Sequence, residues 1–298
     1  KYDFNISEAL TLAWLQLVIA GAVFWVLSYS ARVSWLGSTR STHHGRKERG
    51  YLALGQYIVY LAAWIYLIAP IISLMMAINV ERLLAFPFAA LFKSLSLSLV
   101  IGLSAATLAL VTSIALLSPI RQAVIKRQRQ RETWLSWLAS HSLVAPAMVL
   151  STGSYIWLLK RGSLEQYAML WLIMLNALIL IPFIMGQIRP RFILFDSQYA
   201  QLTDQLKLGF MDRVRVTWPF VSRPVKAAFA LALLLALGDV SIFAIFGSYE
   251  HPTLPWLIYI FAGSYRMGEA AIASIVLLMI CFLLLQLLER NIHVEPHN

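Results

Sequence analysis

Seven long apolar runs constrain the fold of this chain more than any other feature of its sequence. Each run has about 20 residues, the length of an α-helix that crosses the roughly 30 Å hydrocarbon core of a bilayer. Because lipid offers the backbone no hydrogen-bond partners, and because the runs are too long and too uniformly apolar for barrel strands, we expect helices. The sequence predicts an all-α polytopic membrane protein with about seven transmembrane helices, at 9–30, 56–78, 94–117, 135–158, 167–187, 227–247 and 270–288.

The composition supports membrane integration. The chain has 298 residues, of which 60% are hydrophobic and only 13% are charged, so a soluble domain of this kind has too few polar side chains to cover its surface. The net charge of +10 is compatible with nucleic-acid binding, but the basic residues fall in short loops between apolar runs. Topology explains that distribution better, so we expect a lipid bilayer and no nucleic acid as the partner.

The loop charges predict the orientation of the chain. Eighteen of the 24 lysines and arginines fall in the loops after the first, third and fifth apolar runs and in the C-terminal tail, and six fall on the other side. Basic loops stay in the cytoplasm. We therefore expect the stretch 189–226 in the cytoplasm and the start of the chain outside.

The stretch 189–226 is the longest polar interruption between apolar runs, with seven basic and three acidic residues. Asp196 or Ser197 is a candidate cap for a short helix that Gly209 would end, and Pro219 and Pro224 would stop a second short segment. Two interpretations stay open at this point. The loop is either a solvated connector or a helix-turn-helix that docks a partner.

This loop resembles the EAA loop of permease subunits from bacterial ABC importers. Thr203-Asp204-Gln205 stands where the family has Glu-Ala-Ala, and Gly209 follows in register. Val216-Thr217-Trp218-Pro219 matches the family's Ile-x-Leu-Pro, three residues early. In the family this loop forms a coupling helix that lies in a groove of a separate ATPase. The resemblance therefore implies that coupling passes through Thr203, Asp204, Gln205, Gly209, Arg213, Val216 and Pro219.

Motifs inside the apolar runs resemble those of thiamine permeases, whose chains fuse two six-helix halves. The resemblance implies a type I ABC importer permease bundle in a bacterial inner membrane. Such a bundle receives thiamine, or its phosphates, from a periplasmic binding protein. A related permease for ferric ion, a polyamine or an oxyanion is the nearest alternative, and a non-ABC scaffold or channel is an alternative from another class. The matching motifs are Pro146–Gly153 together with Asn176-Ala177-Leu178, Leu237-Gly238-Asp239, Thr253-Leu254-Pro255 and Gly263-Ser264-Tyr265-Arg266.

A weak internal repeat suggests how the chain is divided. Glu8-Ala9 opens the first apolar run shortly after Tyr2, and Glu269-Ala270 opens the last run shortly after Tyr265. Since the start of the chain resembles the end of such a unit, we expect 1–50 to be the last helix of a preceding permease half plus a cytoplasmic linker. Residues 51–298 would then form a six-helix permease domain that partners a second half, fused or separate.

Asp239 is the one acidic residue well inside an apolar run. A carboxylate there is costly and should face the bundle interior or an aqueous path. One hypothesis is that Asp239 lines the translocation path, where its charge favours a cationic solute. The other is that Asp239 is a structural hydrogen-bond acceptor that holds the sixth helix in place.

The sequence offers no catalytic constellation. It contains no Gly-x-x-x-x-Gly-Lys-Ser/Thr motif, so energy for active transport would come from a separate ATPase subunit, and we expect neither an enzyme nor a cofactor. The histidines do not form a metal-ligand cluster. His43 and His44 fall in the basic linker, and His141 stands alone in the fourth run. A short interfacial helix at 253–261 is our first candidate for the site where a binding protein docks.

Overall fold

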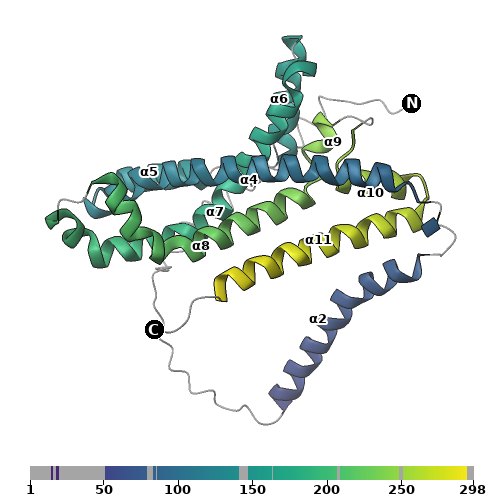
Figure 1. Cartoon of the computed structure of the whole chain (residues 1–298), viewed down its shortest axis with the longest axis horizontal. Helices are drawn as coiled ribbons and strands as arrows, with labels where there is room; N and C mark the ends of the chain where they lie inside the picture. The colour runs from purple at the N-terminus through teal and green to yellow at the C-terminus, as the bar shows by residue number, and fades with distance from the viewer. Residues whose placement is uncertain are drawn as a thin grey trace.

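The computed structural model describes residues 15, 18, 19, 51–78, 83–84, 86–140, 147–162, 164–206, 209–247 and 251–293. These residues are predominantly α-helical, and no strand occurs among them. Figure 1 shows the helices labelled in chain order. Their bounds are α2 (Tyr51–Met76), α4 (Phe88–Ile125), α5 (Arg129–Ser140), α6 (Ala147–Lys160), α7 (Leu164–Gln205), α8 (Phe210–Gly238), α9 (Phe243–Phe246), α10 (Leu254–Gly263) and α11 (Met267–His293).

Five of the described helices are long and apolar enough to cross a bilayer. The spans lie in α2, α4, α7, α8 and α11, at Gly55–Met76, Phe88–Ile125, Gln166–Tyr199, Met211–Gly238 and Met267–Leu287. They contain the third and fifth predicted runs, nearly all of the second and seventh, and more than half of the sixth. The all-α multi-pass fold predicted from the sequence is therefore confirmed for the described part of the chain. The first predicted run, at 9–30, falls almost wholly outside the described residues.

Three helices are longer than a bilayer requires. At 1.5 Å per residue, the 38 residues of α4 extend about 57 Å, and the 42 residues of α7 extend about 63 Å. The 29 residues of α8 extend about 43 Å. Since the hydrocarbon core is about 30 Å thick, these helices carry their packing beyond the membrane. This excess length builds the end of the fold that holds Arg121, Arg189 and Arg213.

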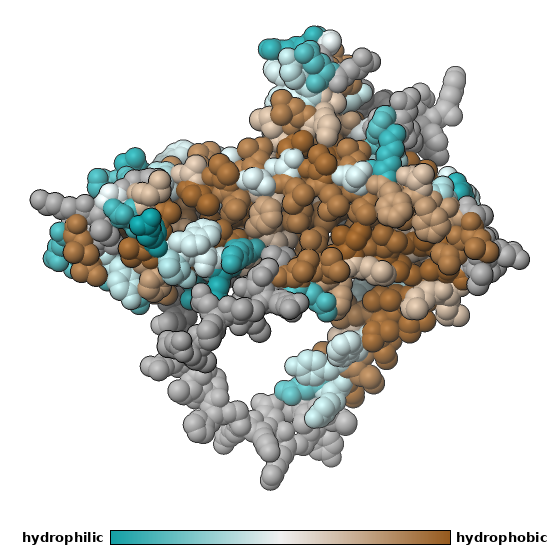
Figure 2. Space-filling view, viewed as in Figure 1, coloured by the Kyte–Doolittle hydropathy of each residue, from teal (hydrophilic) through white to brown (hydrophobic). Residues whose placement is uncertain are grey.

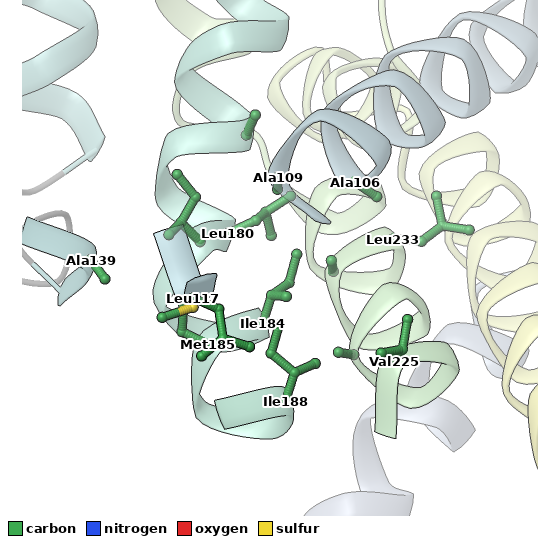
Figure 3. Packing of buried hydrophobic residues seen from close by; sticks show 14 of the residues in the cluster. Ala106, Ala109, Leu117, Ala139, Leu180, Ile184, Met185, Ile188, Val225 and Leu233 are labelled. Atoms are coloured by element: carbon green, nitrogen blue, oxygen red, sulfur yellow. The ribbon is translucent and has the colours of Figure 1, made fainter. Parts of the chain in front are cut away.

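The core lies where α4, α7 and α8 pack together. Small side chains make the close approach possible, because Ala105, Ala106 and Ala109 are fully buried along one face of α4. Larger side chains from α7 fill the space opposite. In Figure 3, Ile184 and Ile188 of α7 point toward α8. The apolar interior is therefore made by interlocking small residues of α4 with branched residues of its two neighbours.

We predict that Ala106→Leu lowers the free energy of unfolding by about 1–3 kcal/mol, because three extra carbons must enter a closely packed interface. The measurement is thermal or denaturant unfolding of the purified chain. Ala115→Leu is the matched control: it is the same substitution on an exposed face of the same helix, and it should leave stability nearly unchanged. Equal effects of the two variants would contradict this account of the α4 interface.

The helices α2 and α11 lie at the edge of this core. The apolar span of α2 buries none of its residues within the described chain, and the main neighbour of α2 among the described helices is α11 (Figure 1). Figure 2 shows hydrophobic surface along the middle of the molecule, with hydrophilic residues gathered at the end that holds α5 and the α7–α8 turn and at the tip of α6. This distribution fits a protein surrounded by lipid through its middle.

Two of the predicted transmembrane runs differ from the structure. The fourth run, at 135–158, is not one helix, because α5 ends at Ser140 and α6 begins at Ala147 and projects away from α4 (Figure 1). The sixth run, at 227–247, is interrupted, because α8 ends at Gly238 and the backbone of Asp239 is extended. Hydropathy alone merges such pieces, since a break inside an apolar run does not change its average hydropathy.

Candidate functional site

The stretch 189–226 is not a loop but the ends of two long helices. Helix α7 continues to Gln205 and α8 begins at Phe210, so only a short turn around Leu206 and Gly209 separates them. The prediction that Asp196 or Ser197 caps a short helix is therefore wrong, because both residues lie inside α7. Packing against α4 and α8 carries the helix through this polar sequence, as tertiary contacts often override local signals.

The predicted roles of Gly209 and of two prolines also need correction. Gly209 does not end a helix but is the N-cap of α8, with φ −64° and ψ 168°, a conformation open to any residue. Pro219 and Pro224 do not stop a short segment, because both lie inside α8. A proline in a helix loses one backbone hydrogen bond. Burial of Val221 and Val225 on the core side of α8 offsets that loss.

The predicted coupling residues lie on both sides of the turn between α7 and α8, at one end of the molecule. Thr203, Asp204 and Gln205 form the last turn of α7, Gly209 caps α8, and Arg213, Val216 and Pro219 occupy the first turns of α8. The side chains of Thr203 and Asp204 are outside the described part. Apolar side chains at the start of α8 are exposed, with Met211 70% exposed. An exposed apolar surface with a basic rim is typical of a docking site for another protein.

An ion pair fixes this end of α7 to α4. The guanidinium of Arg121 donates two hydrogen bonds of 2.6 Å to the carboxylate of Asp196, one to each oxygen. The Arg121 guanidinium also lies 4.9 Å from the ring centroid of Phe192. The side chains of Arg121 and Asp196 are 27% and 10% exposed, so water screens the pair only in part. Bidentate geometry of this kind restricts both side chains and thereby the helices that carry them.

Further contacts hold the α7–α8 hairpin together. Phe195 and Tyr199 of α7 and Phe220 of α8 form a triangle of rings with centroid distances of 5.2, 5.3 and 5.4 Å. Arg189 of α7 donates a 2.9 Å hydrogen bond to Glu132 of α5. The hairpin is therefore joined to α4 and α5 by directed contacts, and it can move as one body with them.

A second candidate site lies at the other end of α8, about 43 Å from the turn. Four polar residues from four segments line one small cavity there: Ser98 of α4, Asn176 of α7, Asp239 after α8 and Thr253 before α10. Three of the motifs that resemble thiamine permeases contribute to it, through Asn176, Asp239 and Thr253. Residues 77 positions apart in the chain, such as Asn176 and Thr253, thus meet at one place.

Asp239 holds the backbone that follows α8. One carboxylate oxygen accepts hydrogen bonds from the Ser241 hydroxyl at 2.7 Å and the Ser241 N–H at 3.2 Å. The other accepts from the Ile242 N–H at 3.3 Å. The side chain thereby caps the turn that leads into α9, in the way that aspartate caps helix starts. This geometry favours the hypothesis of a structural acceptor, while the path role of Asp239 remains a prediction.

The remaining polar groups of the cavity join α10 to the bundle. The backbone N–H of Leu254 donates a 2.7 Å hydrogen bond to the buried hydroxyl of Ser98. Asn176 donates to the carbonyl of Leu172 at 3.0 Å, and the buried hydroxyl of Thr253 has no hydrogen-bond partner among the described residues. The cavity volume of about 10 Å³ has room for about one water molecule. The described arrangement is therefore closed to an organic solute at this point.

Sequence reasoning missed several residues of these sites. Ser98 lies four positions after Ser94, and both are buried on one face of α4, so serines at helical spacing in an apolar run were an available signal. Arg121 and Asp196 carried no such signal, because nothing local relates residues 75 positions apart. His251 is exposed, and His43, His44 and His141 are outside the described residues. Within the described residues, no group of three potential metal ligands occurs.

The helices, the apolar surface and the two polar ends define the described chain as an all-α polytopic membrane protein. A scan against protein-family models finds no match. The chain is, however, similar over nearly its whole length to proteins named thiamine transport system permease protein ThiP. It is 30% identical to that of Brucella abortus over 297 residues and 27% identical to that of Escherichia coli K12 over 295, in each case over 97% of this chain.

The Haemophilus influenzae protein of the same name is 27% identical over 95% of this chain. The resemblance to thiamine permeases that the motifs predict is thus confirmed as homology. The chain spans about half the length of these relatives, between 53% and 55%. What the relatives transport therefore bears on this chain only as a proposal.

Proposed function

We propose that this chain is the membrane-spanning permease part of a binding-protein-dependent ABC importer for thiamine or thiamine phosphates. The observation that carries the proposal is the homology to thiamine transport permeases over 97% of the chain. The substrate follows from these relatives' names and not from the chemistry of any described residue. The inner membrane of a bacterium is the location that this function requires.

The α7–α8 turn is the part of the chain proposed to receive force from a separate cytoplasmic ATPase. Its support is the exposed apolar surface around Met211, Val216 and Trp218 together with the ion pair of Arg121 and Asp196 behind it. A surface that must transmit movement needs a rigid backing, because a soft backing would absorb the displacement. The Phe195, Tyr199 and Phe220 rings supply part of that backing.

Helix α8 is proposed to carry the displacement across the membrane. It runs without interruption from Gly209 to Gly238, and the cap formed by Asp239 lies at its far end. A shift of the turn therefore reaches the cavity that contains Ser98 and Thr253. Opening that closed polar cluster would make a passage for solute between α4, α7 and α10, as alternating access requires.

The outer end is proposed to dock a periplasmic binding protein. Helix α10 begins at Leu254, so the predicted short helix at 253–261 is present. Trp256 and Tyr259 stack there with ring centroids 5.0 Å apart, and Tyr259 is exposed. Exposed aromatic side chains on a rigid helix are typical of contact surfaces between proteins.

The division of the chain also remains a proposal. In it, residues 51–298 form one permease half, and 1–50 contain the last helix of a preceding half and a linker. The exposed apolar face of α2 supports a second permease half as a partner, since nothing in the described chain covers that face.

The test of this function is ATP-driven uptake of labelled thiamine into vesicles that contain the whole transporter. We expect saturable uptake by the unchanged protein. The uptake rate of Asp239→Ala should be at least tenfold lower, because loss of the cap frees the turn after α8. Asp239→Asn keeps an acceptor oxygen for Ser241 and should retain most of the uptake. If Asp239→Asn removed thiamine uptake as fully as Asp239→Ala, the carboxylate charge in the path would be the better explanation. Uptake of a polyamine or ferric ion in place of thiamine would contradict the proposed substrate.

A further inference from the structure

The corner between α4 and α5 concentrates positive charge. Lys126, Arg127, Arg129 and Arg131 fall within six residues, and all four are exposed. None of them has an ion-pair partner among the described residues, and the nearby Glu132 is already paired with Arg189. Four unpaired cations this close together repel one another, so the corner favours a multiply charged or clustered anionic partner.

One of these basic residues occupies a position that favours glycine. Helix α4 ends in a Schellman motif. The N–H of Gln128 donates to the carbonyl of Ala123 at 2.8 Å, and the N–H of Arg127 donates to the carbonyl of Val124 at 3.1 Å. Arg127 between them has φ 55°, the left-handed conformation usual for glycine in this type of helix end. An arginine kept in this conformation leads to the hypothesis that its side chain has a role.

Helix α5 presents an apolar stripe beside these charges. Trp134, Trp137 and Leu138 are 71%, 53% and 47% exposed, and their spacing places them on one side of the helix. The opposite side is packed, because Ala139 belongs to the buried cluster that contains Leu117 of α4 (Figure 3). Near its end, α5 therefore has one apolar side that packs in the protein core and a second apolar side, the stripe, that is exposed.

The position of α5 sets this stripe near the end of the apolar part of α4. Helix α5 lies alongside α4 (Figure 1), and Ala139 packs in the same cluster as Leu117. After Lys93 near its start, α4 carries no further charge until Arg121, four residues after Leu117. This level, where apolar side chains give way to basic ones, is where tryptophan concentrates in membrane proteins.

We propose that the α4–α5 corner binds an anionic phospholipid. The headgroup phosphate is held by the four basic residues Lys126, Arg127, Arg129 and Arg131. The part of the acyl chain nearest the headgroup lies against Trp134, Trp137 and Leu138. The juxtaposition of a cation cluster with an exposed apolar stripe matches a molecule that is anionic at one end and apolar at the other. A small soluble anion would use only the cations, and a partner protein would cover the tryptophans and exclude lipid.

The experiment measures quenching of tryptophan fluorescence in the whole chain, reconstituted in lipid nanodiscs. The discs contain phosphatidylcholine with a minor fraction of either brominated phosphatidylglycerol or brominated phosphatidylcholine. Subtracting the signal of a Trp134→Phe/Trp137→Phe variant isolates these two residues. We expect the brominated phosphatidylglycerol to quench them more strongly. Equal quenching by both lipids would mean an ordinary interfacial anchor, and no quenching would mean a protein-covered face; either result overturns the proposal.

A charge variant and a matched control separate specific binding from general attraction. Arg127→Gln/Arg131→Gln should weaken the apparent affinity for phosphatidylglycerol by about fivefold per charge removed. Lys160→Gln/Arg161→Gln removes the same charge at the far end of α6 and should leave the quenching unchanged. If both pairs reduced the quenching equally, net charge alone would be the cause and the site would be rejected.

Arg127→Gly separates a structural role from lipid binding. Glycine relieves the left-handed backbone conformation, so the melting temperature should rise. The same change removes one cation, so the preference for phosphatidylglycerol should fall by about fivefold. A higher melting temperature with an unchanged lipid preference would remove Arg127 from the site.

Discussion

Gly209→Trp is expected to reduce co-purification of the ATPase subunit with this chain by more than tenfold, while the chain still folds. The backbone of Gly209 has φ −64°, and among the described residues a Cβ there would meet only the Asp212 side chain, at 3.7 Å. A large side chain therefore fits the fold and projects from the turn that is proposed to enter the groove of the ATPase. Loss of the glycine N-cap should cost about 1 kcal/mol at most. The measurement is affinity purification of the tagged chain, with the unfolding temperature recorded in parallel.

Gly209→Ser is the matched control for this experiment. Serine is small and caps helices at least as well as glycine, so both stability and co-purification should be preserved. If the tryptophan variant co-purified as much ATPase as the serine variant, the α7–α8 turn would not be the docking surface. The alternative interpretation of this region, a solvated connector between helices, would then be the correct one.

Arg121→Met should lower the free energy of unfolding by about 2–4 kcal/mol. The change leaves the carboxylate of Asp196, which is 10% exposed, without its bidentate partner. Breaking a buried pair in this way is costly, because an unpaired charge remains out of water. The residual exposure of Arg121 places the estimate below the full cost for a buried pair. Denaturant unfolding of the purified chain provides the measurement.

Two further variants test the reason for this effect. Arg189→Met breaks the more exposed pair with Glu132 and should cost no more than about 1 kcal/mol. The double variant Arg121→Met/Asp196→Leu removes both charges together and should recover most of the lost stability. A double variant as unstable as Arg121→Met alone would show that packing by the arginine side chain, and not the unpaired charge, causes the loss.

These contacts link the two ends of the fold. The pair of Arg121 and Asp196 fixes α7 to α4, and the rings of Phe195, Tyr199 and Phe220 fix α7 to α8. Helix α8 then reaches the cap at Asp239 without a break. Under the proposed function, weakening either contact should reduce transport even where the ATPase still binds, because displacement of the turn would be absorbed before it reached the cavity.

The residues of the candidate coupling site could be selected from the sequence, but their arrangement in space could not be predicted. The motif residues Thr203 to Pro219 were predicted from their resemblance to the EAA loop, and the structure places them at one end of the molecule. Their coupling role stays a prediction. Their secondary structure was predicted incorrectly, because proline and glycine, here Pro219 and Gly209, are strong local signals for the end of a helix. In the fold, burial of Val221 and the contacts of Phe220 outweigh that local preference and keep α8 continuous.

The break after α8 illustrates the opposite case. Asp239 was predicted to be a costly carboxylate inside a helix, yet the helix ends at Gly238 and the carboxylate caps the turn beyond it. Hydropathy averages over about 20 residues and is insensitive to such a break. The hydrogen bonds of Asp239 with Ser241 and Ile242 satisfy the backbone there, which makes an interruption tolerable inside a membrane protein.

The sequence by itself determined that this chain is an all-α membrane protein, because runs of about 20 apolar residues leave the backbone no alternative to helices in lipid. It also determined the homology to thiamine permeases, through motifs that can be read in order. Only the tertiary structure decided which polar residues meet, as in the pair of Arg121 and Asp196 and the cluster of Ser98, Asn176 and Thr253. Such meetings depend on how long helices pack side by side, and packing joins residues that no local pattern relates.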